Sequence, residues 1–325
     1  TTFEPGADLT SAKRLALRMY NEGYAPPPPW GGETDVPAPE VPERTEPADP
    51  AALVADVELA SLPTIFAKLV EAINNPRSSA ASIAEVVGKD TSLSARLLKV
   101  VNSPFYGFPS RIDTISRAVT IIGTKQLTTL AVGICAMDVF QGVPEDVVDM
   151  RTFWQHSLGA GLLARLLAAH CDVANTERLF VCGLLHDIGH LLLYTYRTKQ
   201  AVAAVALGRA EGVPLFEAER RILGFDHSRL GAELLRLWKL PVTIENAVAH
   251  HHEPSKSHDP REAAIVAVAN TMAYALDMGG SGETRMPPVP RHVLKLAEMP
   301  LGALGQAAAQ ADTQFKALTG AILSR

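Results

Sequence analysis

Residues 183–193 read GLLHDIGHLLL, so two histidines and an aspartate lie inside an otherwise apolar run. Ionisable side chains are costly to bury unless an opposite charge or a hydrogen-bonding group compensates them. No Lys or Arg lies close to Asp187 in the sequence. A buried Asp187 therefore needs a positive partner from elsewhere in the fold, or a raised pKa.

The apolar residues around this stretch follow a helical period from about residue 51 onward. Segments such as 62–75, LPTIFAKLVEAINN, repeat apolar residues at helical spacing, and period-two alternation is absent. We therefore predict an all-α, multi-helix bundle. In its second half and at its end we expect helices at 150–170, 176–196, 198–211, 214–223, 226–238, 241–251, 261–278, 290–298 and 301–322.

Composition suggests four parts along the chain of 325 residues. Residues 1–50 form an N-terminal extension with a short helix at 8–24, followed by a Pro-rich, acidic linker that lacks the aliphatic residues of a core. We expect an N-terminal helical subdomain at 51–148 and a second helical subdomain, carrying the histidines, at 149–285. The last part, 286–325, is expected to form C-terminal helices.

The overall charge and the cysteines exclude several classes of protein. A net charge of −5 gives no basic surplus for nucleic acid or for an anionic membrane. No run of 18 apolar residues and no signal peptide is recognisable. Cys135, Cys171 and Cys182 form no CxxC pattern and read as reduced thiols, so we expect a cytoplasmic protein.

Histidines recur beside aliphatic positions throughout the second subdomain. A single one is more typical of a core histidine bonded to a carbonyl, but several imidazoles that converge on Asp187 favour a divalent metal site. Adjacent residues of a helix point about 100° apart, which suits an Asp187 that bridges two ions while His186 binds one. His170, His258 and His292 are expected to be ordinary. The histidines considered are His156, His186, His190, His227, His250, His251 and His252.

These residues resemble the ligand set of the HD superfamily of metal-dependent phosphohydrolases, H…HD…H…HH…D. The resemblance implies metal ligands at His156, His186, Asp187, His227, His251 and His252. Asn270 stands where the family has its last Asp, which leaves Asp187 as the one sure carboxylate and Glu253 as a candidate second. One or two ions of iron, manganese or zinc would suit such a site.

The chain is most similar to one branch, the HDOD domain, an HD-related output domain of bacterial signalling proteins. The match covers roughly residues 55–275 and includes Leu62-Pro63, the "NSPFYG" loop at 102–107 and "AVTIIG" at 118–123. It implies an HD-domain-like bundle that acts through protein–protein contacts. Its implied partners are histidine kinases, cyclic-dinucleotide enzymes or motility machinery, with neither nucleic acid nor membrane.

The resemblance leaves two functions open, and the first is favoured. One is a regulatory module without catalysis, with no catalytic or cofactor-binding residues beyond the metal ligands. The other is a metal-dependent phosphohydrolase for a nucleotide or other phosphoester, in which His190 or Glu253 shuttles protons. The Lys and the "GYP" loop of HD-GYP cyclic-dinucleotide hydrolases are missing, since His190 and "PSKSHDP" at 254–260 stand in their places.

Two further segments also allow alternative interpretations. Residues 82–103 could form a helix-turn-helix for DNA, but their small basic excess favours two helices that pack into the bundle. The loop NSPFYGFPSR at 102–111 could present Phe105, Tyr106, Phe108 and Arg111 as a recognition surface, or could fill a gap between helices.

Overall fold

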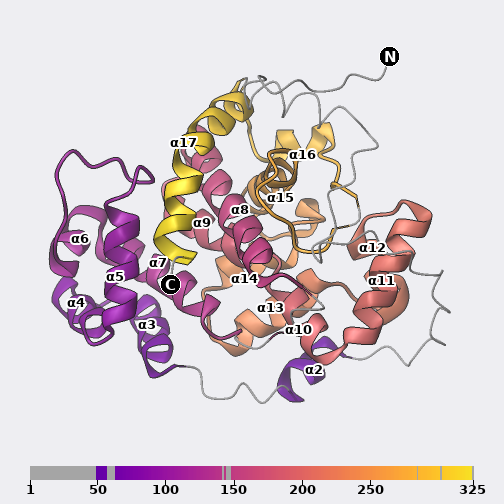
Figure 1. The fold of residues 1–325 in the computed structure, drawn as a ribbon, viewed down its shortest axis with the longest axis horizontal. Helices are drawn as coiled ribbons and strands as arrows, with labels where there is room; N and C mark the ends of the chain where they lie inside the picture. The colour runs from indigo at the N-terminus through magenta and orange to yellow at the C-terminus, as the bar shows by residue number, and fades with distance from the viewer. Residues whose placement is uncertain are drawn as a thin grey trace.

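The computed structural model describes residues 49–56, 63–140, 143, 148–283, 285–300 and 302–323. Every regular element within these ranges is a helix and none is a strand, which confirms the all-α prediction. The predicted helix at 8–24 and the Pro-rich linker lie outside the described residues. Figure 1 shows two groups of helices that lie side by side.

The first group surrounds one largely buried helix. Its members are α3 (Thr64–Asn74), α4 (Ala80–Gly88), α5 (Thr91–Val101), α6 (Ile115–Ile122) and α7 (Thr124–Met137). Side-chain oxygens cap three of the helices: Ser79 forms a capping box at α4, Asp90 caps α5 and Thr114 caps α6. Helix α7 is buried from Leu127 to Met137 because it also faces the second group.

The second group is built around one long helix, α8. It contains α8 (Met150–His170), α9 (Thr176–Leu185), α10 (Ile188–Tyr196), α11 (Thr198–Glu211), α12 (Leu215–Leu223), α13 (His227–Leu237), α14 (Val242–Ala249), the 3-10 turn η1 (Pro254–Lys256) and α15 (Pro260–Ala275). Helices α9 and α15 pack on α8, while α10 packs on α13. This arrangement brings together the end of α9, the start of α13 and the end of α14, with the second turn of α8 beside the end of α9.

Two glycines in the GLLHDIGHLLL stretch allow the closest approaches between helix backbones. A β-carbon on Gly183 would lie 2.7 Å from the carbonyl oxygen of Ala160 in α8. A β-carbon on Gly189 would lie 2.0 Å from the carbonyl oxygen of His227 in α13. The absence of a side chain at these two positions therefore fixes the residues between them against α8 on one side and α13 on the other.

Several predicted helix limits differ from the structure, among them 278, since α15 ends at Ala275, and two of the differences fall at histidines of the site. The expected helix 176–196 is broken, because His186 ends α9 and Asp187 precedes α10. The expected helix 241–251 ends at Ala249, so His251 and His252 lie in the turn that follows. Both breaks free side chains from the strict helical spacing and allow neighbouring residues to point into one centre.

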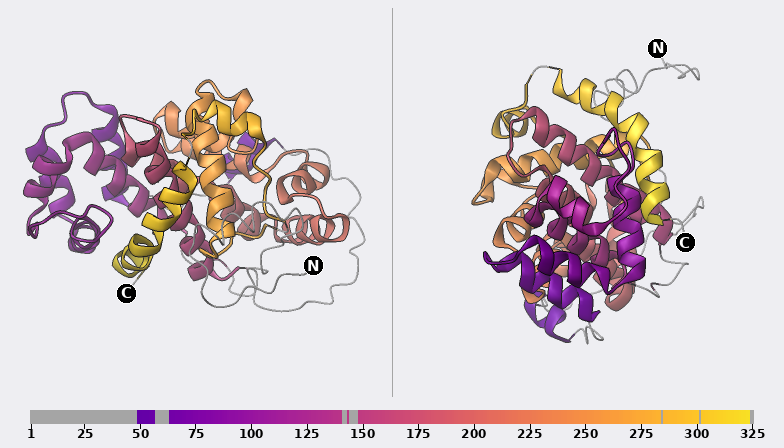
Figure 2. Two further views of the ribbon diagram at one scale, coloured as in Figure 1. Left: turned by 90° about the horizontal axis from the view of Figure 1, so that it is seen from above. Right: turned by 90° about the vertical axis from the view of Figure 1, so that its left-hand side faces the viewer.

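Of the helices near the two ends of the described chain, α17 connects the two groups, and α2 and α16 pack on the second group. Helix α17 (Ala303–Leu323) runs along α8 and also contacts α5, as Figures 1 and 2 show in yellow. Helix α2 (Pro50–Asp56) packs on α13, away from α3, which follows it in the sequence. Helix α16 (Arg291–Leu296) packs beside α15. The boundaries predicted at residues 50, 148 and 285 stay predictions. Helices of the C-terminal part, 286–325, pack on helices of the two predicted subdomains.

One stretch, Thr176–Tyr196, is apolar and long enough to meet the length and composition of a membrane span. In the fold, however, 89% of its apolar window is buried against other helices. Burial of this kind is typical of the central helix of a globular bundle. The apolar character of this stretch is therefore accounted for by the core.

We expect Gly189→Ala to destabilise the protein by about 2–3 kcal/mol, because the new methyl group would force α10 away from α13. Thermal or urea unfolding measures this change. Gly88→Ala is the matched control, since nothing lies within 4 Å of its added β-carbon and alanine favours a helix. An equal loss of stability in both variants would contradict the close contact at Gly189.

Candidate metal centre

The carboxylate of Asp187 lies at the centre of a cluster of imidazole rings. Asp187 is 2% exposed, and His156, His186 and His227 are fully buried. Its Oδ2 atom lies 3.0 Å from Nε2 of His186 and 3.6 Å from Nε2 of His156. The break between α9 and α10 allows His186 and Asp187 to reach the same point from adjacent positions in the chain.

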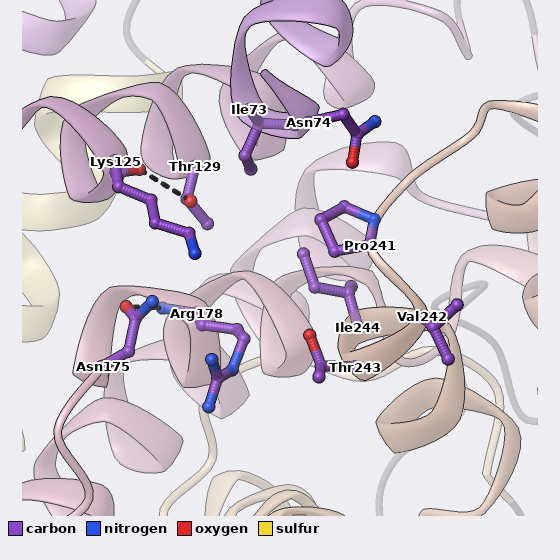
Figure 3. A pocket seen from close by; sticks show the side chains of 10 residues that line it. All are labelled: Ile73, Asn74, Lys125, Thr129, Asn175, Arg178, Pro241, Val242, Thr243 and Ile244. Atoms are coloured by element: carbon purple, nitrogen blue, oxygen red, sulfur yellow. Dashed lines mark hydrogen bonds between the residues drawn. The ribbon is translucent and has the colours of Figure 1, made fainter. Parts of the chain in front are cut away.

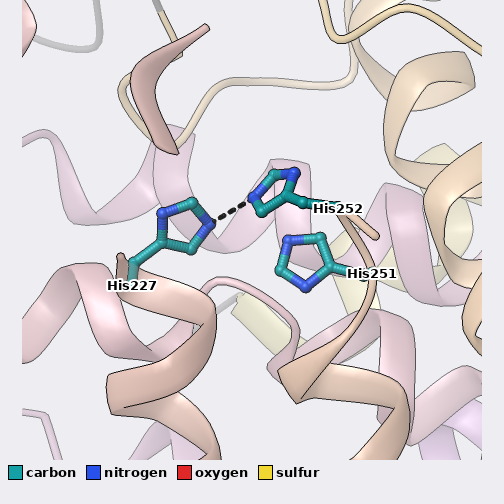
Figure 4. A group of neighbouring side chains, drawn as sticks. All are labelled: His227, His251 and His252. Carbon is teal, nitrogen blue, oxygen red and sulfur yellow. Dashed lines mark hydrogen bonds between the residues drawn. The ribbon is translucent and has the colours of Figure 1, made fainter. Parts of the chain in front are cut away.

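The second carboxylate oxygen of Asp187 faces a different set of rings. Its Oδ1 atom lies 3.3 Å from Nε2 of His227 and 3.7 Å from Nε2 of His251. The Nε2 atom of His252 lies 2.9 Å from Nε2 of His227, and Figure 4 shows the three rings converging from α13 and from the turn after α14. Asp187 thus has one oxygen for each of two groups of histidines.

Backbone carbonyls determine which nitrogen of two rings carries the proton. Nδ1 of His186 lies 2.7 Å from the carbonyl oxygen of Gly183, and Nδ1 of His251 lies 2.7 Å from that of Val248. A carbonyl oxygen only accepts hydrogen bonds, so both Nδ1 atoms are donors. In the neutral rings, each Nε2 therefore directs a lone pair at the oxygens of Asp187, and both Nε2 atoms are buried without a hydrogen bond. Two acceptors that face each other in a buried place require a cation or an additional proton between them.

The same pattern is typical of histidines that bind metals. A metal-binding imidazole usually donates its other N–H to a carbonyl or carboxylate, which fixes the ring and its tautomer. His227 follows this rule with a carboxylate, since its Nδ1 lies 2.7 Å from Oε2 of Glu219. In each of three sets of residues, the possible ligand atoms lie within 4.8 Å of one another. The sets are His156, His186 and Asp187; His227, His251 and His252; and Asp187, His190 and His227. All the predicted ligands thus lie in one cluster, and their binding of an ion stays a prediction.

Asn270 of α15 lies where the resemblance implies a carboxylate. Its Oδ1 atom is 3.0 Å from Nε2 of His156, and the residue is 2% exposed. An amide oxygen can contribute to a cation site but brings no charge. The group formed by His156, His186 and Asp187 therefore has Asp187 as its single negative charge.

Glu253, the candidate second carboxylate, does not lie in the cluster. It is 32% exposed and pairs with Arg220 at 2.7 Å and Lys256 at 2.6 Å. Glu219 of α12 is the second buried carboxylate instead, at 2% exposure. The sequence does carry a signal for it, because Glu219 lies on the apolar face of α12 with Leu215, Ala218 and Ile222.

A segment after α15 covers the cluster, and the sequence analysis missed its role. The hydroxyl of Ser281, which is fully buried, donates a short hydrogen bond to Oδ2 of Asp187. Tyr194 donates to the carbonyl oxygen of Ser281 at 2.6 Å, and Tyr274 contacts its hydroxyl at 2.6 Å. Positive φ at Gly279 and Gly282 lets the backbone approach α8 and Tyr194 closely. The segment therefore closes the cluster at Asp187.

Burial and neighbouring charges shift the pKa values of the cluster in opposite directions. Burial alone would raise the pKa of Asp187 and Glu219, but nearby histidines hold the pKa of Asp187 well below its usual value and that of Glu219 at about 2. Burial would lower the pKa of His227, but Glu219 and Asp187 raise it well above the usual value. Burial raises the pKa of Glu283 to about 8. Burial lowers the pKa of the remaining shifted rings, His156 to about 3 and also His190, His251 and His252.

The "NSPFYG" loop contributes mainly to packing at Phe105. This residue is 2% exposed and contacts the ring of Phe180 edge-on at 5.1 Å, with the guanidinium of Arg165 4.2 Å from its ring centre. Tyr106 and Phe108, which are half-buried, stack on each other at 5.5 Å. The gap-filling interpretation therefore holds for Phe105. The helices of the helix-turn-helix candidate, α4 and α5, both pack against α6 and α7.

A separate hollow of about 320 Å³ lies where α3 and α7 meet α9 and α14. Figure 3 shows Lys125 and Arg178 beside it, and its lining contains no carboxylate. Arg178 is paired with the buried Glu262 of α15. This hollow lies between the two groups of helices, and its lining shares no residue with the histidine cluster.

Comparison with known proteins agrees with the fold. The HDOD domain model matches residues 59–254. An uncharacterized protein of Treponema pallidum (strain Nichols) is 29% identical over 259 residues, which are 77% of this chain and 48% of that protein. The chain thus spans about half the length of this curated relative.

Solved structures share the fold. A Shewanella amazonensis SB2B protein, provisionally described as a phosphohydrolase, is 27% identical with a TM-score of 0.67, over 84% of this chain and 98% of that one. An HDOD domain protein of unknown function from Geobacter sulfurreducens is 23% identical with a TM-score of 0.66, over 84% and 96%. The second likeness establishes the fold alone. Since the family model matches more than half of its residues, the chain belongs to the HDOD family.

Proposed function

We propose that this HDOD chain is a regulatory signalling module whose buried cluster holds a divalent cation without hydrolysing a substrate. The observation that carries the proposal is the pair of Nε2 lone pairs, from His186 and His251, directed at Asp187 in a place closed to solvent. A cation between these atoms would satisfy all three residues at once. An imidazole-rich set with few carboxylates suits zinc, iron or manganese better than magnesium or calcium.

The geometry supports one ion or two. His156, His186 and one oxygen of Asp187 could hold the first, and His227, His251 and His252 the second, with the other oxygen of Asp187 facing His227 and His251. When bound, such an ion would supply positive charge and, in a hydrolase, a polarised water. In this chain, support of the fold is a simpler role for the ion than hydrolysis, because the ligands that it would link come from separate helices and turns.

Three features argue against hydrolysis. A catalytic metal keeps an open position for water and substrate, whereas Asp187 and His251 are each 2% exposed. Ser281 bonds to Asp187 and lies in the segment that closes the cluster. Asn270 adds no charge beside His156. Of the predicted ligands, only His252 is partly exposed.

The signalling role follows from membership of the HDOD family, together with the resemblance to output domains of bacterial signalling proteins. We propose that the partners are signalling proteins, such as histidine kinases, cyclic-dinucleotide enzymes or motility machinery. We also propose a cytoplasmic location, in keeping with three buried cysteines that form no disulfide. Co-purification from native cells, followed by identification of the bound proteins, tests this part of the proposal.

The second candidate function is a metal-dependent phosphohydrolase. Two observations favour it: the complete convergence of the predicted ligands on Asp187, and the 27% identical Shewanella protein that is provisionally described as a phosphohydrolase. In that case the segment around Ser281 would have to move to admit a phosphoester. The two functions share a metal site and differ in turnover.

We expect purified protein to contain zinc, iron or manganese, and a chelator to lower its melting temperature by several degrees. An ion at a concentration 100 times its dissociation constant stabilises the folded state by about 2.7 kcal/mol. For a protein of this length, that free energy corresponds to a change of several degrees in melting temperature. Elemental analysis and thermal unfolding measure both effects. Asp187→Asn should lose the metal, whereas the exposed Asp113→Asn should retain it. A metal-free protein whose melting is unaffected by added ions would contradict the proposal.

We expect no hydrolysis of a generic aryl phosphate by the protein loaded with Mn²⁺ or Fe²⁺. The reason is the closed environment of Asp187, which leaves no path for the phosphate. Release of the coloured phenol measures turnover. Turnover that Asp187→Ala abolishes and Asp113→Asn retains would establish the phosphohydrolase instead.

We expect the metal-free protein to lose stability as the pH falls from 7 to 5. The histidines with lowered pKa, namely His156, His190, His251 and His252, stay neutral when folded but take up protons near pH 6.5 when unfolded. The unfolded state then binds more protons, so stability decreases with acid.

Two groups in the cluster have raised pKa values and must be weighed against this effect. His227 is protonated in both states below pH 6.5, so it contributes little to the change there. Glu283, with its pKa raised to about 8, favours the folded state on acidification, but it is one group against several. Unfolding in chelator at pH 7, 6 and 5 tests the balance. A melting temperature that rises toward pH 5 would show that the imidazoles are not buried in neutral form.

A further inference from the structure

His190 lies outside the ligand pattern that the resemblance implies, yet it belongs to the cluster. It is fully buried, three residues after Asp187 at the start of α10. Its ring stacks on that of His227, with centres 3.7 Å apart and planes 23° apart. Ligand atoms of Asp187, His190 and His227 all lie within 4.8 Å of one another.

Glu219 lies beside both His190 and His227, and it forms a hydrogen bond with His227. Its Oε2 atom lies 2.7 Å from Nδ1 of His227, and its Oε1 atom lies 3.2 Å from Nδ1 of His190. A single carboxylate therefore faces the Nδ1 atom of each ring. This leaves Nε2 as the nitrogen available for a ligand on both residues. In His190 both ring nitrogens are buried without a hydrogen bond among the described residues, with Nδ1 at ion-pair distance from Glu219 and Nε2 facing no partner.

An unpartnered imidazole nitrogen in a fully buried place is costly unless something binds it. The nearest charged group other than Glu219 is the shared carboxylate of Asp187, which already faces His227. Glu219 also supplies the negative charge that Asn270 does not, from the opposite side of the cluster. The surroundings of His190 are therefore those of a metal ligand with its supporting carboxylate.

We propose that His190 is an additional ligand of the ion held by Asp187 and His227, and that Glu219 is the positioning residue for both rings. The inference rests on the proposed cation site and specifies its composition. An extra imidazole shifts a site toward zinc, cobalt or iron(II) and away from magnesium or calcium. The expected ligand is therefore a borderline transition-metal ion.

The test uses the full chain, stripped of metal and titrated with Co²⁺ and Zn²⁺. His190→Phe keeps a stacking ring and removes both nitrogens, and Glu219→Gln keeps the shape and removes the charge. The exposed His292→Phe is the matched control. We measure ion affinity by competition with a chromophoric chelator, and the visible absorption of bound Co²⁺, which depends on the number and type of ligands.

We expect His190→Phe and Glu219→Gln each to weaken Zn²⁺ binding by about 10- to 100-fold. His190→Phe should also change the Co²⁺ spectrum, and His292→Phe should match the wild type in both measurements. If His190→Phe does not fold, His190→Gln replaces it with the same expectations, and circular dichroism of the metal-free protein decides which is used. Wild-type affinity and an unchanged spectrum in the folded His190 variant would overturn this inference alone. Failure of the wild type to bind any ion would instead overturn the proposed cation site and this inference with it.

Discussion

The burial of one carboxylate among imidazole nitrogens is the constraint on which the rest of this structure depends. Asp187 has no Lys or Arg partner, and its oxygens face Nε2 atoms of His186 and His227 at 3.0 and 3.3 Å. Without an ion, a proton on His227 can compensate part of this charge, because Glu219 and Asp187 raise the pKa of that ring. The Nδ1 atoms of His186 and His251 donate to backbone carbonyls, so in the neutral rings the Nε2 lone pairs face Asp187. A cation or a further proton between these nitrogens and Asp187 would complete the hydrogen bonding of the cluster.

The close backbone contacts of two glycines make this concentration of polar groups possible. Gly183 lies against α8, which carries His156, and Gly189 lies against the carbonyl of His227. Each contact brings one partner of Asp187 to its side from a distant part of the sequence. The same two residues lie on either side of the break between α9 and α10. Packing and site are thus set by one short segment, so a mutation there would change both.

Much of the fold and part of the site could be predicted from the sequence. The helical period identified the class, and the spacing of His156, His186, Asp187, His227 and the pair His251-His252 identified residues that do lie together. The helix break at His186–Asp187 could not be predicted, because apolar residues on both sides continue the helical pattern. Glu219 and Ser281 were missed because their roles depend on contacts with residues 8 and 94 positions away. Glu253 was a plausible ligand beside His252 in sequence, but Arg220 and Lys256 hold it at the surface.

The two carboxylates and the amide together suggest how such a cluster can persist without hydrolysis. Charge at a metal site can come from ligands or from the residues that support them, and both stabilise the ion electrostatically. Here the side that contains Asn270 has no charge of its own, while the side that contains Glu219 has a buried one. The ion would then be held most firmly on the Glu219 side, around His190 and His227. On the other side, Ser281 and Tyr274 already bond near Asp187, where a substrate would otherwise have to enter. Under the proposed function, such a site would bind its ion as a metal enzyme does and would lack the open position that catalysis requires.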